Sequence, residues 1–201
     1  DVERSRGLGD VYKRQMLQIH AKTAFENMSV DDIQKWIILN YERLIGSAVF
    51  TKNKSLTSKI VSRVESWKCK NKCFIPSHTA SVIEYNNDIY MFDMKPLRAS
   101  VRPLADYLSD TEDDYVLILR NFKLDTRMFS VNIAEHINEF YPFISALGSA
   151  FNKRQTKWSR HCSEMHLREL QKQGILTHLN PEITPDELFH ELSRKDALYS
   201  I

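Results

Sequence analysis

The chain has 201 residues, of which 42% are hydrophobic and 27% are charged, a composition typical of a folded protein with one sizeable core. Its 28 Lys and Arg residues against 26 Asp and Glu residues leave a formal net charge of +2. That balance argues against nucleic acid as a partner, because nucleic-acid-binding proteins gather positive charge on one face. No apolar run reaches membrane-spanning length, and three cysteines, an odd number, do not suggest a disulfide framework.

Residues 1–15 show no hydrophobic periodicity, and residues 7–15 resemble a sequencing adaptor translated in frame, a contaminant of environmental assemblies. We expect residues 1–15 to be such an artefact, with a natural disordered tail as the alternative. The chain proper then begins at Met16. Since no charged-then-apolar signal peptide follows Met16, we expect a cytoplasmic or virion-associated protein.

The first predicted helix begins at Ser29, a favourable N-cap residue, and carries apolar residues at helical spacing until Gly46. Residues 16–45 are therefore expected to form a helical lead-in, followed by a main domain over residues 46–201. The short apolar run at residues 47–50 indicates a buried strand.

A second helix is expected to begin at Ser55 or Thr57. Cys69 and Cys73 follow it with three residues between them, and His78 lies beyond. Zinc sites use cysteine pairs at such short spacings, but no second pair lies nearby to complete four ligands. We therefore expect neither a metal nor another cofactor.

Two β-rich runs flank Asn86 and Asn87, a strong signal for a hairpin. With a two-residue loop, Asp93 lies on the same face as His78 and diagonal to it, and diagonal neighbours are roughly 7–8 Å apart. Glu84 lies roughly 20 Å from His78 along the strand. Asp93 rather than Glu84 is thus expected to orient His78, whereas a three-residue loop would put Asp93 on the opposite face.

Further elements follow from the same periodicities. They are a short helix with Pro103 in its first turn, an acidic turn at residues 109–114, a buried strand at 115–120, a helix at 125–143, and a loop at 145–155. Near the end, Thr184 and Glu187 predict a capping box at the start of a short helix.

Cys162 stands at the predicted start of an amphipathic helix that ends at Gly174, where a left-handed cap belongs. Its apolar side is expected to carry Met165, Leu167 and Leu170, and its wet side Glu164, Arg168, Glu169, Lys172 and Gln173. A helix start offers unpaired N–H groups and a partial positive charge, which favour a thiolate and so a better nucleophile. The alternative is that Cys162 is a small buried hydrophobic residue.

Cys162, His78 and Asp93 together predict a nucleophile, a base and an orienting carboxylate. The imidazole takes the thiol proton, and the carboxylate fixes the tautomer and the direction of the ring. Backbone N–H groups at the helix start can hold the oxyanion of an acyl-transfer intermediate.

In order and spacing, these segments resemble the permuted NlpC-like thiol hydrolases, in particular the YiiX-like group. The matching pieces are Gly46-Ser-Ala-Val-Phe-Thr51, Ser77-His78 with its strand, Tyr90-Met-Phe-Asp93, the segments from Pro103 to Arg120, Cys162-Ser-Glu164 with Gly174-Ile175, and Thr184-Pro-Asp-Glu-Leu188. The resemblance covers residues 46–188. The chain departs from the family at Ser47, where an acidic residue is usual, and at Asp93, where glutamate is commoner.

The resemblance implies an α+β, circularly permuted papain-like fold, with an antiparallel sheet packed against the helix that bears the cysteine. It also implies a cysteine amidase or peptidase that forms a thioester acyl-enzyme on Cys162, with His78 and Asp93 completing the triad. The expected substrates are a peptide, a peptidoglycan fragment, or an acyl or lipid-linked group, and an acyltransferase is a variant of the same chemistry. The alternative is an inactive papain-fold module with a binding or structural role. An environmental sequence of this kind can come from a bacteriophage.

Overall fold

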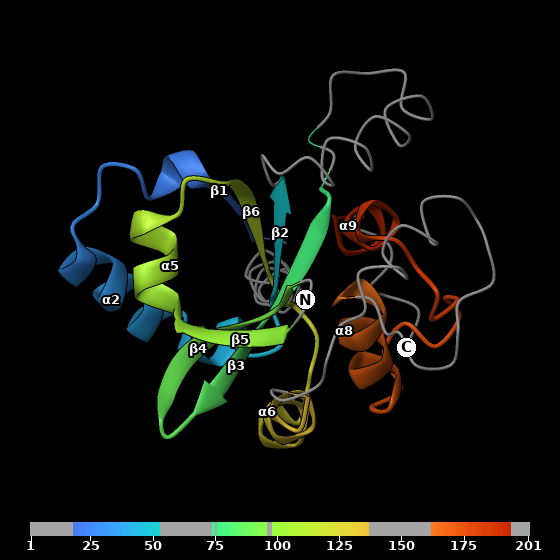
Figure 1. The fold of residues 1–201 in the computed structure, drawn as a ribbon. Helices are drawn as coiled ribbons and strands as arrows, with labels where there is room; N and C mark the ends of the chain where they lie inside the picture. Colours follow the sequence, from blue (N-terminus) through green and yellow to red (C-terminus); the bar gives the residue numbers. More distant parts are fainter. Residues whose placement is uncertain (1–17, 53–73, 75, 96–97, 137–161, 194–201) are drawn as a thin grey trace, which may run out of the picture.

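A computed structural model describes residues 18–52, 74, 76–95, 98–136 and 162–193 (Figure 1). In this part of the chain, six strands form an antiparallel sheet in the order β1-β6-β2-β3-β4-β5, which with its helices gives an α+β fold. The strands are β1 (Gln18–Ala21), β2 (Ala48–Lys52), β3 (His78–Tyr85), β4 (Asp88–Lys95), β5 (Arg98–Pro103) and β6 (Asp114–Leu119). The helices are η1 (Lys22–Ala24), α2 (Val30–Leu39), α3 (Tyr41–Leu44), α5 (Leu104–Asp110), α6 (Thr126–Ala134), α8 (Cys162–Gln171) and α9 (Pro185–Ser193).

Helices cover both faces of the sheet: α2 and α5 lie on one face, and α8 and α9 on the other (Figure 1). Side chains alternate along each strand and so divide the apolar residues into two cores. The core we call the α8 core includes Ala48, Phe50, Ile83, Phe92, Met94, Ile118, Phe129, Cys162, Met165, Leu167 and Leu170. The core we call the α5 core includes Phe25, Ile33, Val49, Ala80, Val82, Met91, Leu104, Leu117 and Leu119. The helix with the cysteine therefore packs directly on the sheet.

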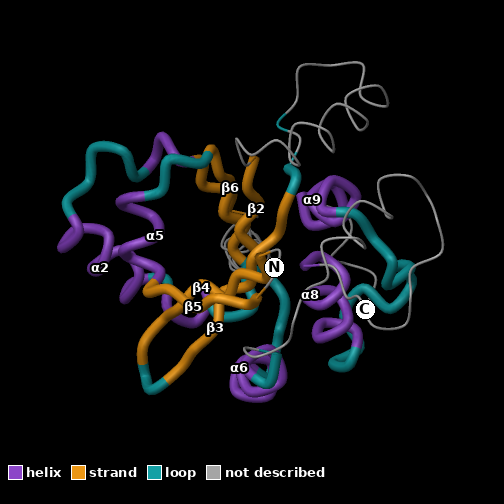
Figure 2. Tube along the Cα trace, viewed as in Figure 1, coloured by secondary structure: helices purple, strands orange, loops and turns teal. Residues whose placement is uncertain are grey.

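The turn between β3 and β4 is the two-residue loop that the sequence predicts (Figure 2). Asn86 and Asn87 have φ angles of 51° and 62°, the left-handed conformation that both central residues of a type I′ turn require. The pairing follows the predicted register, with Tyr85 opposite Asp88. This register brings Asp93 to the face on which it was expected.

The lead-in at residues 16–45 is helical only in part, which corrects the sequence prediction. It includes β1, an edge strand of the sheet that pairs with β6, with Gln18 opposite Leu119. A strand of four residues is too short to give a clear periodic signal. Phe25 and Ile33, also from this segment, belong to the α5 core beside strand residues.

The helix predicted from Ser29 to Gly46 is divided into α2 and α3. Ser29 is the N-cap, as predicted, and its hydroxyl accepts the backbone N–H of Asp32 at 3.2 Å. The division falls at Asn40, whose side-chain amide donates to the carbonyl of Trp36 at 2.8 Å. Asparagine side chains compete in this way with the regular helical hydrogen bonds.

Strand β5 was not predicted, because the sequence around Pro103 indicated only a helix. Pro103 is the last residue of β5 and stands directly before α5. Proline lacks an N–H group and is tolerated in a sheet at edge strands, and β5 is the edge strand beside β4. The buried strand predicted at residues 115–120 is confirmed as β6.

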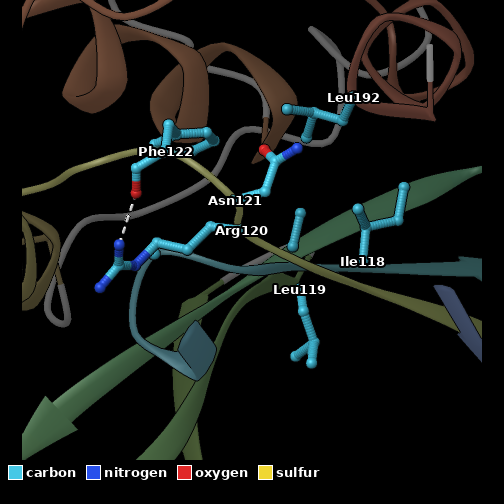
Figure 3. Close-up of a pocket in the computed structure, with 8 residues that line it drawn as sticks. Ile118, Leu119, Arg120, Asn121, Phe122 and Leu192 are labelled. Atoms are coloured by element: carbon cyan, nitrogen blue, oxygen red, sulfur yellow. Dashed lines mark hydrogen bonds between the residues drawn. The ribbon is translucent and has the colours of Figure 1, made fainter. Parts of the chain in front are cut away.

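Arg120, directly after β6, ties that strand to the turn between α3 and β2. Its guanidinium donates to the carbonyl of Phe122 at 2.6 Å (Figure 3). It also donates to the carbonyl of Ile45 at 2.6 Å and to that of Glu42. The hydroxyl of Ser47 accepts the backbone N–H of Arg120 at 3.0 Å. Ser47 is buried, so its hydroxyl serves the packing of this turn.

The ends of the later helices follow the predicted signals. Thr184 and Glu187 form the capping box of α9: the Thr184 hydroxyl accepts the Glu187 N–H at 3.2 Å, and the Glu187 carboxylate accepts the Thr184 N–H at 2.9 Å. Helix α8 is followed by Gly174 with φ 80°, and the N–H of Ile175 donates to the Leu170 carbonyl at 3.0 Å, as in a Schellman motif.

Several predictions fall outside the described residues. They concern residues 1–15, the helix near Ser55, Cys69, Cys73, the end of the helix at 125–143, and the loop at 145–155. Within the described ranges, no helix combines the length and the apolar character needed to cross a bilayer.

Candidate active site

Helix α8 meets the sheet at the first residues of β3. Cys162 is the first described residue of α8 and is 6% exposed. The backbone N–H of Thr79, the second residue of β3, donates to the Cys162 sulfur at 3.4 Å. The sulfur therefore lies beside the strand that carries His78, and it receives a hydrogen bond that favours a thiolate.

His78 is held by Asp93, as the hairpin register predicted. The Nε2 atom of His78 is hydrogen-bonded to a carboxylate oxygen of Asp93, and the side chains are 19% and 6% exposed, respectively. Glu84 lies further along β3, where its side chain bonds Tyr41 and helps burial to raise the Tyr41 pKa to about 12. The expectation that Asp93 rather than Glu84 supports the imidazole is confirmed.

The bond to Asp93 determines which nitrogen of His78 is basic. An ionised carboxylate only accepts hydrogen bonds, so Nε2 must carry a proton. The free lone pair of a neutral His78 is then on Nδ1. His78 and Cys162 each shift the pKa of the other, and because Nε2 is bonded to Asp93, Nδ1 is the ring nitrogen that remains to exchange a proton with the thiol.

The electrostatics of the site favour a thiolate beside an imidazolium. Burial by itself raises the pKa of Cys162, but the positive charge of His78, its hydrogen bond and the Thr79 N–H outweigh burial and lower that pKa. Burial likewise lowers the pKa of His78, but the charges of Cys162 and Asp93 outweigh it and raise that pKa. Each group thus stabilises the charged form of the other, as a nucleophilic cysteine and its base require.

Sequence reasoning missed a second histidine on the same helix. His166 is fully buried, and its Nδ1 atom lies 2.8 Å from the hydroxyl oxygen of Ser81 on β3. Burial lowers the pKa of His166 to about 4. The spacing could have revealed it, because residues four apart on a helix share a face, and His166 follows Cys162 by four.

The wet side predicted for α8 is partly wrong. Glu164 and Glu169 are 5% and 2% exposed, respectively. The carboxylate of Glu164 accepts from Arg168 at 2.7 Å, and that of Glu169 accepts from Lys172 at 2.7 Å. Glu164 is paired with a basic residue one turn further along α8, and Glu169 with Lys172 directly after the helix, and this pairing offsets the cost of burying the carboxylates.

The described part of the chain holds no group of three or more His, Cys, Asp or Glu side chains suited to a metal ion. A hollow between the end of β6 and α9, lined by Arg120, Asn121 and Leu192 among others, has a volume of about 10 Å³ (Figure 3). That volume suits about one water molecule and is too small for an organic substrate.

No protein-family model matches the chain, and a search of curated proteins finds none with significant similarity.

Proposed function

We propose that this chain is a cysteine hydrolase of the permuted papain-like kind, acting on an amide, ester or thioester. The observation that carries the proposal is the line of contacts from Asp93 through His78 to Cys162, with the Thr79 N–H on the sulfur. Nucleophilic catalysis by cysteine needs a thiol beside an imidazole that a carboxylate orients.

The reaction would begin with attack of the Cys162 thiolate on the substrate carbonyl carbon. Backbone N–H groups at the start of α8 would stabilise the resulting oxyanion. His78 would then give its Nδ1 proton to the leaving amine, alcohol or thiol, and the bond to that group would break to leave a thioester on Cys162. Water, deprotonated by His78, would attack the thioester and release a carboxylic acid and the thiol. An acyltransferase would use an acceptor amine, alcohol or thiol in place of this water.

The substrates that suit this chemistry are a peptide, a peptidoglycan fragment, or an acyl or lipid-linked group. The burial of Cys162 within the α8 core supports one alternative, an inactive module that keeps the fold for binding or structure. Reactivity of the thiol separates these two candidates.

The test is the pH dependence of Cys162 alkylation by iodoacetamide, measured in a background that carries Cys69→Ser and Cys73→Ser. We expect reaction well below pH ~8.5, the unperturbed cysteine pKa, and slower reaction at neutral pH in His78→Ala. A thiol that reacts only near pH ~8.5, or is indifferent to His78, would refute the hydrolase proposal.

The matched control is His190→Ala. His190 on α9 also pairs with a carboxylate, that of Asp186 at 3.5 Å, but it is not among the groups that shift the pKa of Cys162. This variant should keep the parent's alkylation profile.

Reaction of the parent with an activated ester should then add the mass of the acyl group to Cys162.

A further inference from the structure

A buried polar pair joins α8 to β3 next to the candidate site. His166 and Ser81 are 0% and 1% exposed, and the His166 Nδ1 atom and Ser81 hydroxyl oxygen are 2.8 Å apart. The other ring nitrogen of His166, Nε2, has no hydrogen-bond partner among the described residues. The ring also makes an edge-to-face contact with Phe129, at 5.5 Å between centroids.

The contact between His166 and Ser81 and the contact between Cys162 and Thr79 are spaced by similar distances along the helix and along the strand. From Cys162 to His166 the helix rises about 6 Å, and from Thr79 to Ser81 the strand rises about 6.6 Å. Two hydrogen bonds therefore join α8 to β3, one between Cys162 and Thr79 and one between His166 and Ser81. The distance between these two bonds is nearly the same along the helix as along the strand. Two such bonds fix the position of the helix along the strand, whereas a single bond allows it to tilt or slide.

At Ser81, β3 is paired with both of its neighbouring strands. Ser81 pairs with Ala48 of β2 on one side and with Phe92 of β4 on the other. The pairing of β3 with β4 runs from Ser81 to Tyr85, and its pairing with β2 runs from Ser81 back to His78. The hydroxyl of Ser81 thus stands where the strand is held by both neighbours.

Packing alone does not account for this pair. A leucine could fill the space of a buried imidazole, and replacing both members of a buried hydrogen bond by apolar groups costs little stability. A histidine with one unsatisfied nitrogen is a less favourable filler than leucine would be. What the polar pair adds is a directional bond, which apolar contacts do not provide.

We propose that Ser81 and His166 form a positioning pair that sets the place of Cys162 against the Thr79 N–H and His78. This inference rests on the proposed function, because it concerns the activation of the same thiol. Neither residue touches the reacting atoms. Their role is to hold α8 at the position along β3 where the Cys162 sulfur contacts both the Thr79 N–H and His78. Misplacement of a reacting group by about 1 Å is enough to impair catalysis strongly.

The experiment measures the pH profile of Cys162 alkylation in Ser81→Ala, again with Cys69→Ser and Cys73→Ser present. Removing one hydroxyl leaves the strand intact, and we expect the midpoint of the profile to rise by about one pH unit. That rise corresponds to alkylation about tenfold slower below the midpoint. Ser81→Thr, which keeps a hydroxyl at this position, should stay within about twofold of the parent.

The matched control is Ser130→Ala. Ser130 is also buried, and its hydroxyl ties α6 to β3 by accepting the Glu84 N–H at 3.0 Å. Its loss should lower the melting temperature without moving the alkylation midpoint. If Ser130→Ala moves the midpoint as far as Ser81→Ala does, the effect is general loosening and the positioning role is wrong.

The outcomes separate this inference from the proposed function. If the parent thiol reacts well below pH ~8.5 and depends on His78, but Ser81→Ala has the parent's profile, the positioning pair is refuted and the hydrolase proposal stands. If the parent thiol has an ordinary profile that does not depend on His78, both are refuted.

Discussion

Two glycines with nearly equal φ angles offer a matched test of the packing at the start of β2. Gly46 has φ 81° and Gly174 has φ 80°, so alanine at either position pays the cost of a left-handed backbone, about 1–2 kcal/mol. The surroundings differ. A Cβ atom on residue 46 would lie 2.2 Å from the Leu124 Cδ2 atom, whereas a Cβ on residue 174 would meet nothing within 4 Å.

Gly46→Ala should therefore be the more destabilising change. Leu124 must turn away and lose packing against the α8 core, an overpacking cost of about 1–3 kcal/mol beyond the backbone strain. The melting temperature should fall by ~2–8 °C in Gly174→Ala, and by a further ~2–12 °C in Gly46→Ala. The reduced entropy of the unfolded chain favours both alanine variants equally and cancels in the comparison.

Thermal unfolding followed by circular dichroism measures both variants. Adding Leu124→Ala to each should narrow the gap between them, since the clash at residue 46 is then absent. This prediction would be refuted if the two glycine variants had equal melting temperatures, or if the gap between them persisted without the Leu124 side chain. Either result would show that the close approach of Leu124 does not cause the extra loss of stability in Gly46→Ala.

Three further predictions concern charge and capping. Asp93→Asn removes a charge that raises the pKa of His78, so the imidazole should lose its proton at a lower pH, as followed by its NMR resonances; an unchanged titration would contradict the role of Asp93. The His166 pKa of about 4 lies below its ordinary value of 6.5, so the unfolded chain binds more protons between these pH values. Stability should consequently fall by about 3 kcal/mol as the pH drops from 6.5 to 4, with a shallower fall in His166→Leu, as measured by urea unfolding; equal slopes in the two proteins would rule this out. Thr184→Ala removes the N-cap of α9 and should cost about 1 kcal/mol in the same assay, whereas Thr184→Ser should cost much less.

The sequence was most informative where local geometry determines a long-range contact. Asn86 and Asn87 set the turn, the turn sets the register, and the register brings Asp93 to His78. The caps at Ser29 and Thr184 could be predicted for the same reason, because each cap depends on a few adjacent residues.

The sequence was least informative where partners are distant in the chain. Glu164 and Glu169 look like surface residues by type, and only the packing of α8 shows that they are buried and paired. Ser81 and His166 are 85 residues apart, so neither gives a local signal for the other. The edge strands β1 and β5 escaped prediction because one has four residues and the other ends in a proline.

The contacts of the site differ widely in sequence separation, and this bears on the order of folding. His78 and Asp93 are 15 residues apart within one hairpin, whereas Thr79 and Cys162 are 83 residues apart. Closing the longer loop costs about 1.5 kcal/mol more in chain entropy, so the hairpin with its base and carboxylate can form before α8 docks. If Cys162 is the nucleophile that we propose, its thiol would keep an ordinary pKa during synthesis and refolding until α8 docks on β3, and would be activated only in the finished fold.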